Sequence, residues 1–231
     1  MNKITLLFER PRYVIKNDGW IAFIKDMFSS LKNQVFFNRI YYLSEGTLKE
    51  GIIAENPRLP DFALKIVSTG QEFERLVTEG FNFHPWYSTC RKRLNRGAIL
   101  LCAFVGNELA HMSWAAVSEE GQKSLAEPPI KVDFANSETV VGGMWTKPKY
   151  RGMGIAPYAS YKRLEYIQKM GRVLSRGSIR KDNVASLRVQ AKRGNRPGTR
   201  LYATGRHLKI MWWESWKETP LNLSEELTTR K

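Results

Sequence analysis

Cysteine is scarce in this 231-residue chain, which contains only Cys90 and Cys102. Two cysteines are too few for a disulfide framework or a cysteine-rich metal site. No apolar run approaches the roughly 20 residues that a membrane-spanning helix needs. The apolar run at residues 4–8 is shorter than the core of a secretory signal, and Glu9-Arg10-Pro11 interrupts it. We therefore expect a cytoplasmic protein without a metal ion.

Acidic residues are also few: 22 Asp and Glu stand against 37 Lys and Arg, so the net charge is +15. Most of this excess lies in residues 139–200, which carry 15 basic and 2 acidic residues, a net charge of +13. A clustered field of one sign attracts anionic partners. The segment therefore predicts either an anion-binding site or a solvated basic face without a specific ligand.

The first 60 residues are predicted to be an N-terminal extension, followed by a main domain at 61–217 and a tail at 218–231. The extension is expected to hold an amphipathic helix and a linker that contains two prolines. Residues 19–40 could lie on a membrane surface, or the helix could pack on the main domain or on the second subunit of a homodimer. The apolar face of this helix would carry Trp20, Ile24, Met27, Phe28, Leu31 and Val35.

Strand patterns alternate with helix patterns along the main domain. This alternation predicts an α/β fold, and the Gly106-Asn107 hairpin signal makes its sheet mixed. Residues 118–138 are predicted to be a long loop. Strands are expected at 62–67, 98–105, 108–117, 139–146, 172–179, 199–204 and 207–213, and helices at 69–79, 88–95, 155–170 and 183–194.

The most informative stretch is Arg151–Ala156, a glycine-rich turn between a predicted strand and a predicted helix. The first backbone N–H groups of a helix have no partner within it, and the helix dipole favours an anion there. Gly152 and Gly154 allow the backbone to approach a ligand without an intervening Cβ. The stretch therefore predicts a phosphate-binding turn.

This order of elements, with a glycine turn after the fourth strand, resembles the GNAT superfamily of N-acyltransferases. The phosphate loop of that family reads Arg/Gln-x-x-Gly-x-Gly/Ala, and Arg151, Gly154 and Ala156 meet it. The resemblance covers roughly residues 61–217. It implies a GNAT-like mixed central sheet that is flanked by helices.

A second part of the family pattern lies further along the chain. Asn183 matches an Asn that opens a later helix, and Gly194 matches a Gly eleven positions after it. Ser186 stands where a small residue is usual. Nothing in the chain resembles the dinucleotide-binding fingerprint, which needs an early βαβ unit with a downstream acidic residue.

The resemblance implies acetyl-CoA or another acyl-CoA as the acyl donor. The acyl carbonyl would lie where the fourth and fifth strands separate, and an amine would attack it directly. The backbone of Met144, Trp145 and Thr146 would pair with the pantetheine arm like an added strand. The pyrophosphate would be bound by backbone N–H groups of Gly152, Met153, Gly154, Ile155 and Ala156.

The proton-transfer residues depart from the family pattern. Gln190 occupies the position of the tyrosine that protonates the leaving thiolate, and an amide can only donate a hydrogen bond there. Glu138, at the entrance of the fourth strand, and His111, on the third, are the candidate bases. Either could instead be a solvated carboxylate or a structural histidine. Tyr158 and Tyr161 could donate a proton or could serve as packing residues.

Two groups of aromatic residues remain. His84-Pro85-Trp86-Tyr87 stands where the acceptor-side segment of the family lies, so it could line an acceptor pocket or form a corner of the core. Met211-Trp212-Trp213 and Trp216 are predicted to pack in the core and at its edge.

These observations predict an N-acyltransferase that moves an acyl group from CoA to a primary amine. The amine could be an amino sugar, an amino acid, a peptide or a polyamine. In one alternative the donor is an acidic acyl carrier protein, which the basic segment would suit. In another the chain is a catalytically silent acyl-CoA-binding protein, because the tyrosine is missing. A nucleic-acid-binding module ranks below these, since no recognised motif is present.

Overall fold

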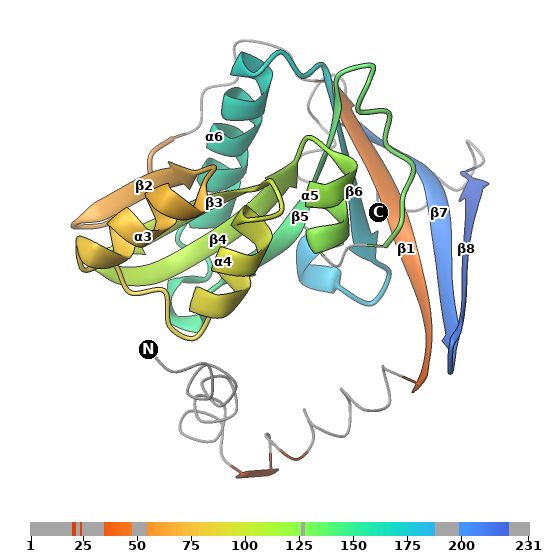
Figure 1. Ribbon diagram of the computed structural model, residues 1–231, viewed down its shortest axis with the longest axis horizontal. Coiled ribbons are helices and arrows are strands. Elements are labelled where there is room, and N and C mark those ends of the chain that lie inside the picture. Colours follow the sequence, from red (N-terminus) through yellow and green to blue (C-terminus); the bar gives the residue numbers. More distant parts are fainter. Residues whose placement is uncertain are drawn as a thin grey trace.

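The computed structural model describes residues 20–21, 24, 35–47, 55–125, 128–187 and 199–221. The described strands form one eight-stranded sheet in the order β2-β3-β4-β5-β6-β1-β7-β8 (Figure 1). The strands are β1 (Phe36–Thr47), β2 (Phe62–Val67), β3 (Ala98–Val105), β4 (Glu108–Ala116), β5 (Glu138–Thr146), β6 (Leu174–Arg180), β7 (Thr199–Ile210) and β8 (Trp213–Pro220).

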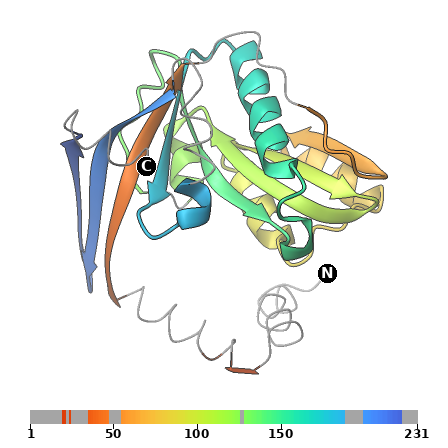
Figure 2. The same ribbon diagram turned by 180° about the vertical axis from the view of Figure 1, so that it is seen from behind.

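Helices cover both faces of the β2–β5 half of this sheet. Helix α6 packs against β3, β4 and β5 on one face, where Ile99, Ala115 and Ile167 form a small apolar cluster (Figure 2). The other face carries the larger core, which includes Phe73, Leu100 and Trp114. The helices on that side are α3 (Gly70–Thr78), α4 (Tyr87–Leu94) and α5 (Glu119–Ser124), whereas α6 is Ile155–Lys169.

Local sequence explains where these elements begin. Helix α3 begins at a capping box, in which the Glu72 N–H donates to the Thr69 hydroxyl at 3.1 Å and the Thr69 N–H donates to the Glu72 carboxylate at 3.2 Å. Strands β3 and β4 are joined across Gly106, whose φ of +57° suits a tight hairpin turn. These elements lie where the sequence predicted them.

Strands β5 and β6 are the only parallel pair among the described strands, and they pair over a short length. The ladder runs from Glu138–Leu174 to Val141–Gly177 and then ends. Beyond it, β5 carries a bulge, because two residues, Gly143 and Met144, lie opposite the single Ser113 of β4. A bulge bends its strand, so β5 turns away from β6 at this point.

The structure confirms the predicted mixed sheet with flanking helices and corrects the predicted extent of the N-terminal extension. Residues 36–47 are a 12-residue strand that pairs with both β6 and β7. They are therefore an integral part of the sheet rather than a helix end or a linker. Of the amphipathic helix predicted before them, only Trp20, Ile21, Ile24 and Val35 are described, and these four residues are helical.

Three smaller expectations also change. The strands predicted at 199–204 and 207–213 are one long strand, β7, followed by a turn at Met211-Trp212 and the strand β8. The loop predicted at 118–138 contains α5, which Ser118 caps by accepting from the Gly121 N–H. Met211, Trp212 and Trp213 are exposed instead of packed in the core, whereas Trp216 packs against the core.

Candidate functional site

The glycine turn between β5 and α6 has the geometry of an anion site. Gly152 and Gly154 have φ values of +82° and +77°, which side-chain-bearing residues rarely adopt. A Cβ built on either glycine would meet no atom of the described chain within 4 Å, so the space beside the turn is open. The N-terminus of α6 has no side-chain cap and no acidic residue in its first turn. Its first N–H groups therefore remain available to an anion.

The second part of the site is an open backbone edge. Among the described strands, Trp145 and Thr146 of β5 pair only with Met112 and His111 of β4, because the ladder to β6 has ended at Val141. The edge that faces β6 can therefore accept an extended ligand as an added strand. Ligands of open α/β sheets bind outside the carboxyl ends of strands, where the chain order switches. This edge leads along Met144, Trp145 and Thr146 directly to the glycine turn.

His111 lies against the end of this strand and is fully buried. It is the register partner of Thr146, and its Nδ1 lies 2.8 Å from the Thr146 Oγ1. Such burial favours a role in positioning the end of β5 over direct contact with a substrate. Arg151 also holds this end, since its Nε donates to the Thr146 carbonyl at 3.2 Å.

A cluster around Glu108 fixes the connection between β5 and α6. The Glu108 carboxylate accepts from Lys147, from Lys149 at 2.5 Å and from the Tyr150 hydroxyl at 2.6 Å. Burial alone would raise the pKa of Glu108, but these three donors outweigh it and lower the pKa to about 2. The carboxylate therefore offsets one of the two lysine charges, and the cluster anchors the segment that leads into the glycine turn.

The matched residues after β6 lie at the same end of the parallel pair. Asn183 begins a helical turn, in which its Oδ1 accepts from the Ser186 N–H at 3.1 Å and its carbonyl accepts from the Leu187 N–H at 3.0 Å. Asn183 and Ser186 thus follow β6 as the glycine turn follows β5. Gln190 lies outside the described residues, so its role toward the leaving thiolate stays a prediction.

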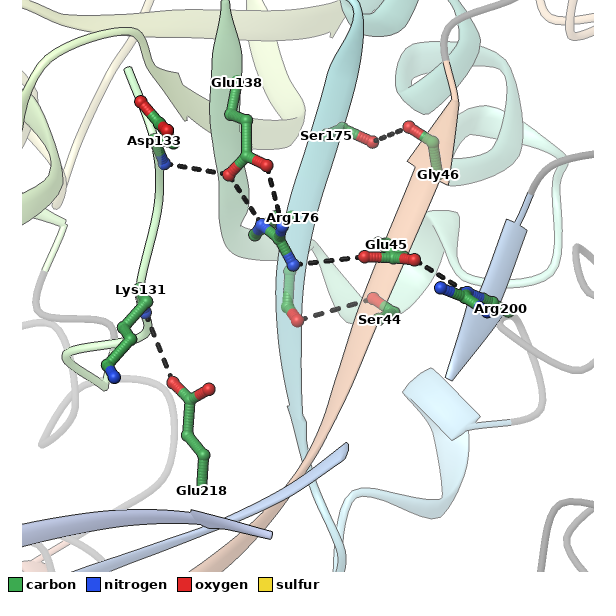
Figure 3. A network of polar contacts seen from close by, with 11 residues as sticks. Ser44, Glu45, Gly46, Lys131, Asp133, Glu138, Ser175, Arg176, Arg200 and Glu218 are labelled. Atoms are coloured by element: carbon green, nitrogen blue, oxygen red, sulfur yellow. Dashed lines mark hydrogen bonds and ion pairs between the residues drawn. The ribbon is translucent and has the colours of Figure 1, made fainter. Parts of the chain in front are cut away.

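Glu138 lies at the opposite end of β5 from the glycine turn, and the nine-residue strand between them is roughly 26 Å long by strand rise. Arg176 donates to both of its carboxylate oxygens at 2.7 Å, and the Asp133 N–H donates at 2.8 Å (Figure 3). These hydrogen bonds, above all those from Arg176, lower the pKa of Glu138. Such a carboxylate is a weak proton acceptor, and its contacts are those of a structural ion pair.

The same ion pair belongs to a network that sequence patterns did not reveal. Arg176 also donates to Glu45 of β1 at 3.1 Å, and Glu45 accepts from Arg200 of β7 at 2.7 Å (Figure 3). The Arg176 guanidinium lies 5.1 Å from the centre of the Tyr202 ring. Tyr202 is the extra residue of a bulge in β7, which allows it and its neighbour Ala203 to lie on the same face.

A pocket of about 900 Å³ opens above this network. Among the described residues, its lining includes four carboxylates and two cations, Lys131 and Arg176, and the charge of Arg176 is already matched by Glu138 and Glu45. Glu218 accepts from two neutral donors, the Lys131 N–H at 3.3 Å and the Trp216 Nε1 at 3.0 Å. The remaining carboxylates are Glu119 and Asp133. The pocket therefore favours a cationic ligand, in a chain whose net charge is +15.

This pocket lies close to the point where β5 and β6 separate. Arg176 pairs with Val140, one register position before the last pair, Val141–Gly177. One residue of strand corresponds to about 3.3 Å. Five separate parts of the chain contribute to the lining, at 117–119, 131–138, 176, 202 and 218. No local sequence signal could have identified it.

The predicted acceptor segment at 84–87 packs near the end of β5. Trp86 contacts Trp145, with ring centres 5.6 Å apart, and the Tyr87 hydroxyl donates to Glu74 at 2.8 Å. Both Trp86 and Tyr87 pack against the larger core. These contacts favour the core-corner interpretation for the two side chains.

Ion pairs neutralise much of the basic segment at 139–200. Among the described residues of the segment, seven cations lie in ion pairs with carboxylates, and three of those carboxylates, Glu45, Glu108 and Glu138, come from outside the segment. The local field is therefore weaker than the net charge of the segment suggests. Among the described residues no group of His, Cys, Asp and Glu could hold a metal ion.

No protein-family model matches this chain, and no curated protein matches it. Several solved structures are similar to it. A putative acetyltransferase of the GNAT family from Novosphingobium aromaticivorans is 16% identical over 73% of this chain and 62% of its own, with a TM-score of 0.43. A tandem GNAT protein from the clavulanic acid biosynthesis pathway is 14% identical over 85% and 58%, with a TM-score of 0.46.

An aminoglycoside acetyltransferase from an uncultured soil metagenomic sample is 13% identical over 59% of this chain and 88% of its own, with a TM-score of 0.38. The present chain spans less than two thirds of the length of the first of these proteins. Similarities this distant do not identify a substrate or establish an activity. The functional argument therefore depends on the geometry of the chain itself.

Proposed function

We propose that this chain is an N-acyltransferase that moves an acyl group, as in acetyl-CoA, directly to a primary amine. One observation carries the proposal: the only parallel strand pair described separates at Val141–Gly177 and leaves an open edge that leads to an uncapped glycine turn. The open edge suits an extended pantetheine arm, and the turn suits a pyrophosphate. Acyl-CoA would supply the acyl group as a thioester whose carbonyl carbon an amine can attack.

The residues of this chain would hold and orient the donor. The N–H groups from Gly152 to Ala156 would bind the pyrophosphate, and the open edge at Met144–Thr146 would pair with the pantetheine arm. Backbone N–H groups of the same edge could donate to the oxyanion that develops on the carbonyl. The Glu108 cluster and the His111–Thr146 contact would keep this edge in place.

Both cysteines argue for direct transfer instead of an acyl-enzyme intermediate. Burial raises the pKa of the Cys90 thiol to about 12 and raises the pKa of the Cys102 thiol well above its ordinary value. The nucleophilic form of cysteine is the thiolate, which neither residue provides near neutral pH. The attacking group in the proposed reaction is therefore the amine of the acceptor.

We further propose that the pocket above Arg176 holds the acceptor amine. An ammonium group would be attracted to Glu218 and Asp133, whose carboxylates accept mainly from neutral donors. Phe134 and Tyr202 supply aromatic surface in the same pocket. The position of the pocket beside the strand separation would let the amine reach a carbonyl bound there.

Calorimetric titration with CoA tests the donor site. Gly154→Val is expected to weaken CoA binding at least about tenfold, because the side chain would occupy the open space of the anion and strain the turn. Gly171→Val is the matched control, since Gly171 has a φ of +79° and an equally open surrounding at the other end of α6. Equal CoA affinity in both folded variants would reject the donor site.

Release of free thiol from acetyl-CoA, measured with a panel of primary amines, tests the reaction and the acceptor pocket. Glu218→Gln keeps the acceptor oxygen for Lys131 and Trp216 but removes the charge. It is expected to raise the KM for the amine about tenfold or more while CoA affinity stays unchanged. Glu79→Gln, at an exposed ion pair with Arg75, is the control. An unchanged KM would exclude Glu218 from the acceptor site, and no thiol release with any amine would oppose the enzymatic function.

A further inference from the structure

Strands β1, β7 and β8 form a wing of the sheet whose outer face α6 does not cover (Figure 2). Tyr41 is buried in the core, so the residues that alternate with it point outward. The cross-strand register places the outer residues in rows. The first two rows are Phe36–Ile210–Trp213 and Asn38–Leu208–Ser215, and the next is Ile40–Arg206–Lys217.

The end of this wing carries a continuous exposed apolar surface. We call it the tip patch, and it consists of Val35, Phe36, Ile210, Met211, Trp212 and Trp213. The start of β1 lies beside the β7–β8 turn (Figure 1), and the Met211 N–H donates to the Val35 carbonyl at 2.5 Å. Trp212 is 86% exposed and Trp213 is 51% exposed. Exposed aromatic groups of this size mark an interaction surface.

Charge on the same face indicates what this surface contacts. We consider the outward positions of β1 from Phe36 to Tyr42 and their register partners on β7 and β8. These positions include Arg206 and Lys217 but no carboxylate. A second copy of this chain would bring like charges together across a symmetric contact, which is unfavourable. An anionic surface would match both the cations and the net charge of +15.

Tryptophan is the side chain that most favours the boundary between lipid and water, because its ring is apolar and its N–H is polar. Basic residues behind an apolar tip add attraction to anionic headgroups. The described helical residues that precede β1, namely Trp20, Ile21 and Ile24, are also apolar and exposed. No described helix is long and apolar enough to cross a membrane.

We propose that the tip patch docks this protein onto an anionic membrane surface, with Trp212 and Trp213 entering the headgroup region. The outer face with Arg206 and Lys217 then lies against the anionic lipids. This docking does not depend on the acyl-transfer reaction, because the tip patch contains no residue of the donor site or of the acceptor pocket.

Co-sedimentation of the full chain with vesicles tests the proposal. The vesicles contain phosphatidylcholine alone or phosphatidylcholine mixed with phosphatidylglycerol. The protein is expected to sediment with the anionic vesicles and only weakly with the neutral ones. Trp212→Ala/Trp213→Ala is expected to lower binding to the anionic vesicles about tenfold or more. Arg206→Gln/Lys217→Gln is expected to lower the same binding roughly tenfold and to leave binding to neutral vesicles unchanged.

Met170→Ala/Val173→Ala is the matched control, since both side chains are large, apolar and exposed but lie beyond the end of α6. Trp212→Ala alone is tested as well in case the double variant does not fold. This single variant is expected to fold, because a side chain this exposed contributes little to the core. Absence of vesicle binding by the unmodified chain would overturn the proposal, as would equal losses in the control. A dimer in light scattering that Trp212→Ala dissociates, without any change in vesicle binding, would show that the patch joins two copies and would also overturn it.

Discussion

Gly143 controls the direction of β5 at the point where the donor would bind. Its φ is +56°, and a Cβ built on it would lie 2.9 Å from the Trp114 Cδ1. The bulge therefore needs glycine for two reasons, the left-handed backbone and the close approach of a buried indole. The bulge bends β5 away from β6, so glycine at position 143 is what allows the open edge to form.

Gly143→Ala is expected to lower the free energy of unfolding by roughly 2–4 kcal/mol, from backbone strain and from the clash with Trp114. Gly106→Ala provides the comparison, since Gly106 has a φ of +57° with no atom within 4 Å of a built Cβ. That variant should lose only the strain component, about 1–2 kcal/mol. Urea denaturation measures both. Equal losses in the two variants would mean that the Trp114 contact relaxes freely.

Glu138 and Arg176 join β5 to β6 just before the strands separate. The Glu138 carboxyl has a lowered pKa because Arg176 donates to it. A folded-state pKa below the unfolded value means that the ionised carboxylate stabilises the fold above its ordinary pKa. That contribution is lost as the pH falls through the folded-state pKa.

Glu138→Gln is therefore expected to lower the free energy of unfolding by about 1–3 kcal/mol at neutral pH. The difference from the unmodified chain should begin to shrink as the pH falls below about 4.3, where the carboxyl of the unfolded chain binds a proton. It should be lost once the pH falls through the lowered pKa of the folded state. Urea denaturation at a series of pH values measures this, with the exposed Glu79→Gln as the control. A large loss of turnover at unchanged stability would instead support Glu138 as the catalytic base.

At the scale of elements, the connection from β5 to α6 depends on one carboxylate from β4. Glu108 is paired with Lys147 and Lys149, and Glu165 on α6 is similarly paired with Lys162 and Lys169. The pKa of each of these glutamates is lowered to about 2. Of these two clusters, only that of Glu108 connects separate elements, so the two glutamates form a matched pair for experiment.

Glu108→Gln is expected to destabilise the fold by about 1 kcal/mol and to weaken CoA binding several-fold, because the approach to the glycine turn loses its anchor. Faster hydrogen exchange at residues 147–154 should accompany this change. Glu165→Gln, which removes only exposed contacts within a helix, should change stability by less than about 0.5 kcal/mol. Unaltered exchange at 147–154 in Glu108→Gln would show that the η1 turn (Pro148–Tyr150) holds itself in place.

At the scale of the whole molecule, β1 makes the sheet continuous. It lies between β6 and β7, and its Leu43 is fully buried while Tyr41 is nearly so. Glu45 of the same strand also pairs with cations of both neighbours, Arg176 and Arg200. Without β1, the β7–β8 hairpin would have no partner strand in the sheet.

Deletion of residues 1–47 is expected to abolish cooperative folding, whereas deletion of residues 1–34 should retain it. The first deletion removes β1 and exposes the apolar core residues that β1 covers between β6 and β7. The second deletion leaves β1 intact. Circular dichroism during thermal unfolding, combined with size-exclusion chromatography, compares the two. If the chain without residues 1–47 still unfolds in a cooperative transition of ordinary size, β1 is not needed for folding. The N-terminal extension that the sequence predicted would then be correct.

The sequence by itself determined the elements whose signals are local. The capping box at Thr69, the Gly106 hairpin, the strand predicted at 139–146 and the glycine turn before α6 depend on neighbouring residues, and each lies within one residue of where its pattern placed it. The mixed α/β class followed from their order. Gly154 could be identified from the sequence as part of a phosphate-binding turn, because a left-handed turn at the start of a helix requires glycine within a few residues of the first helical position.

Only the tertiary structure decided what depends on residues distant along the chain. The pairing of β1 with β6 and β7, the ion pairs of Glu138 and Glu108, and the pocket above Arg176 join segments that are tens of residues apart. The exposure of Trp212 likewise depends on the register of β7 with β8, since the aromatic residues alone favoured a buried position. Hydrophobicity indicates that a side chain can be buried, but the sheet order determines whether anything covers it.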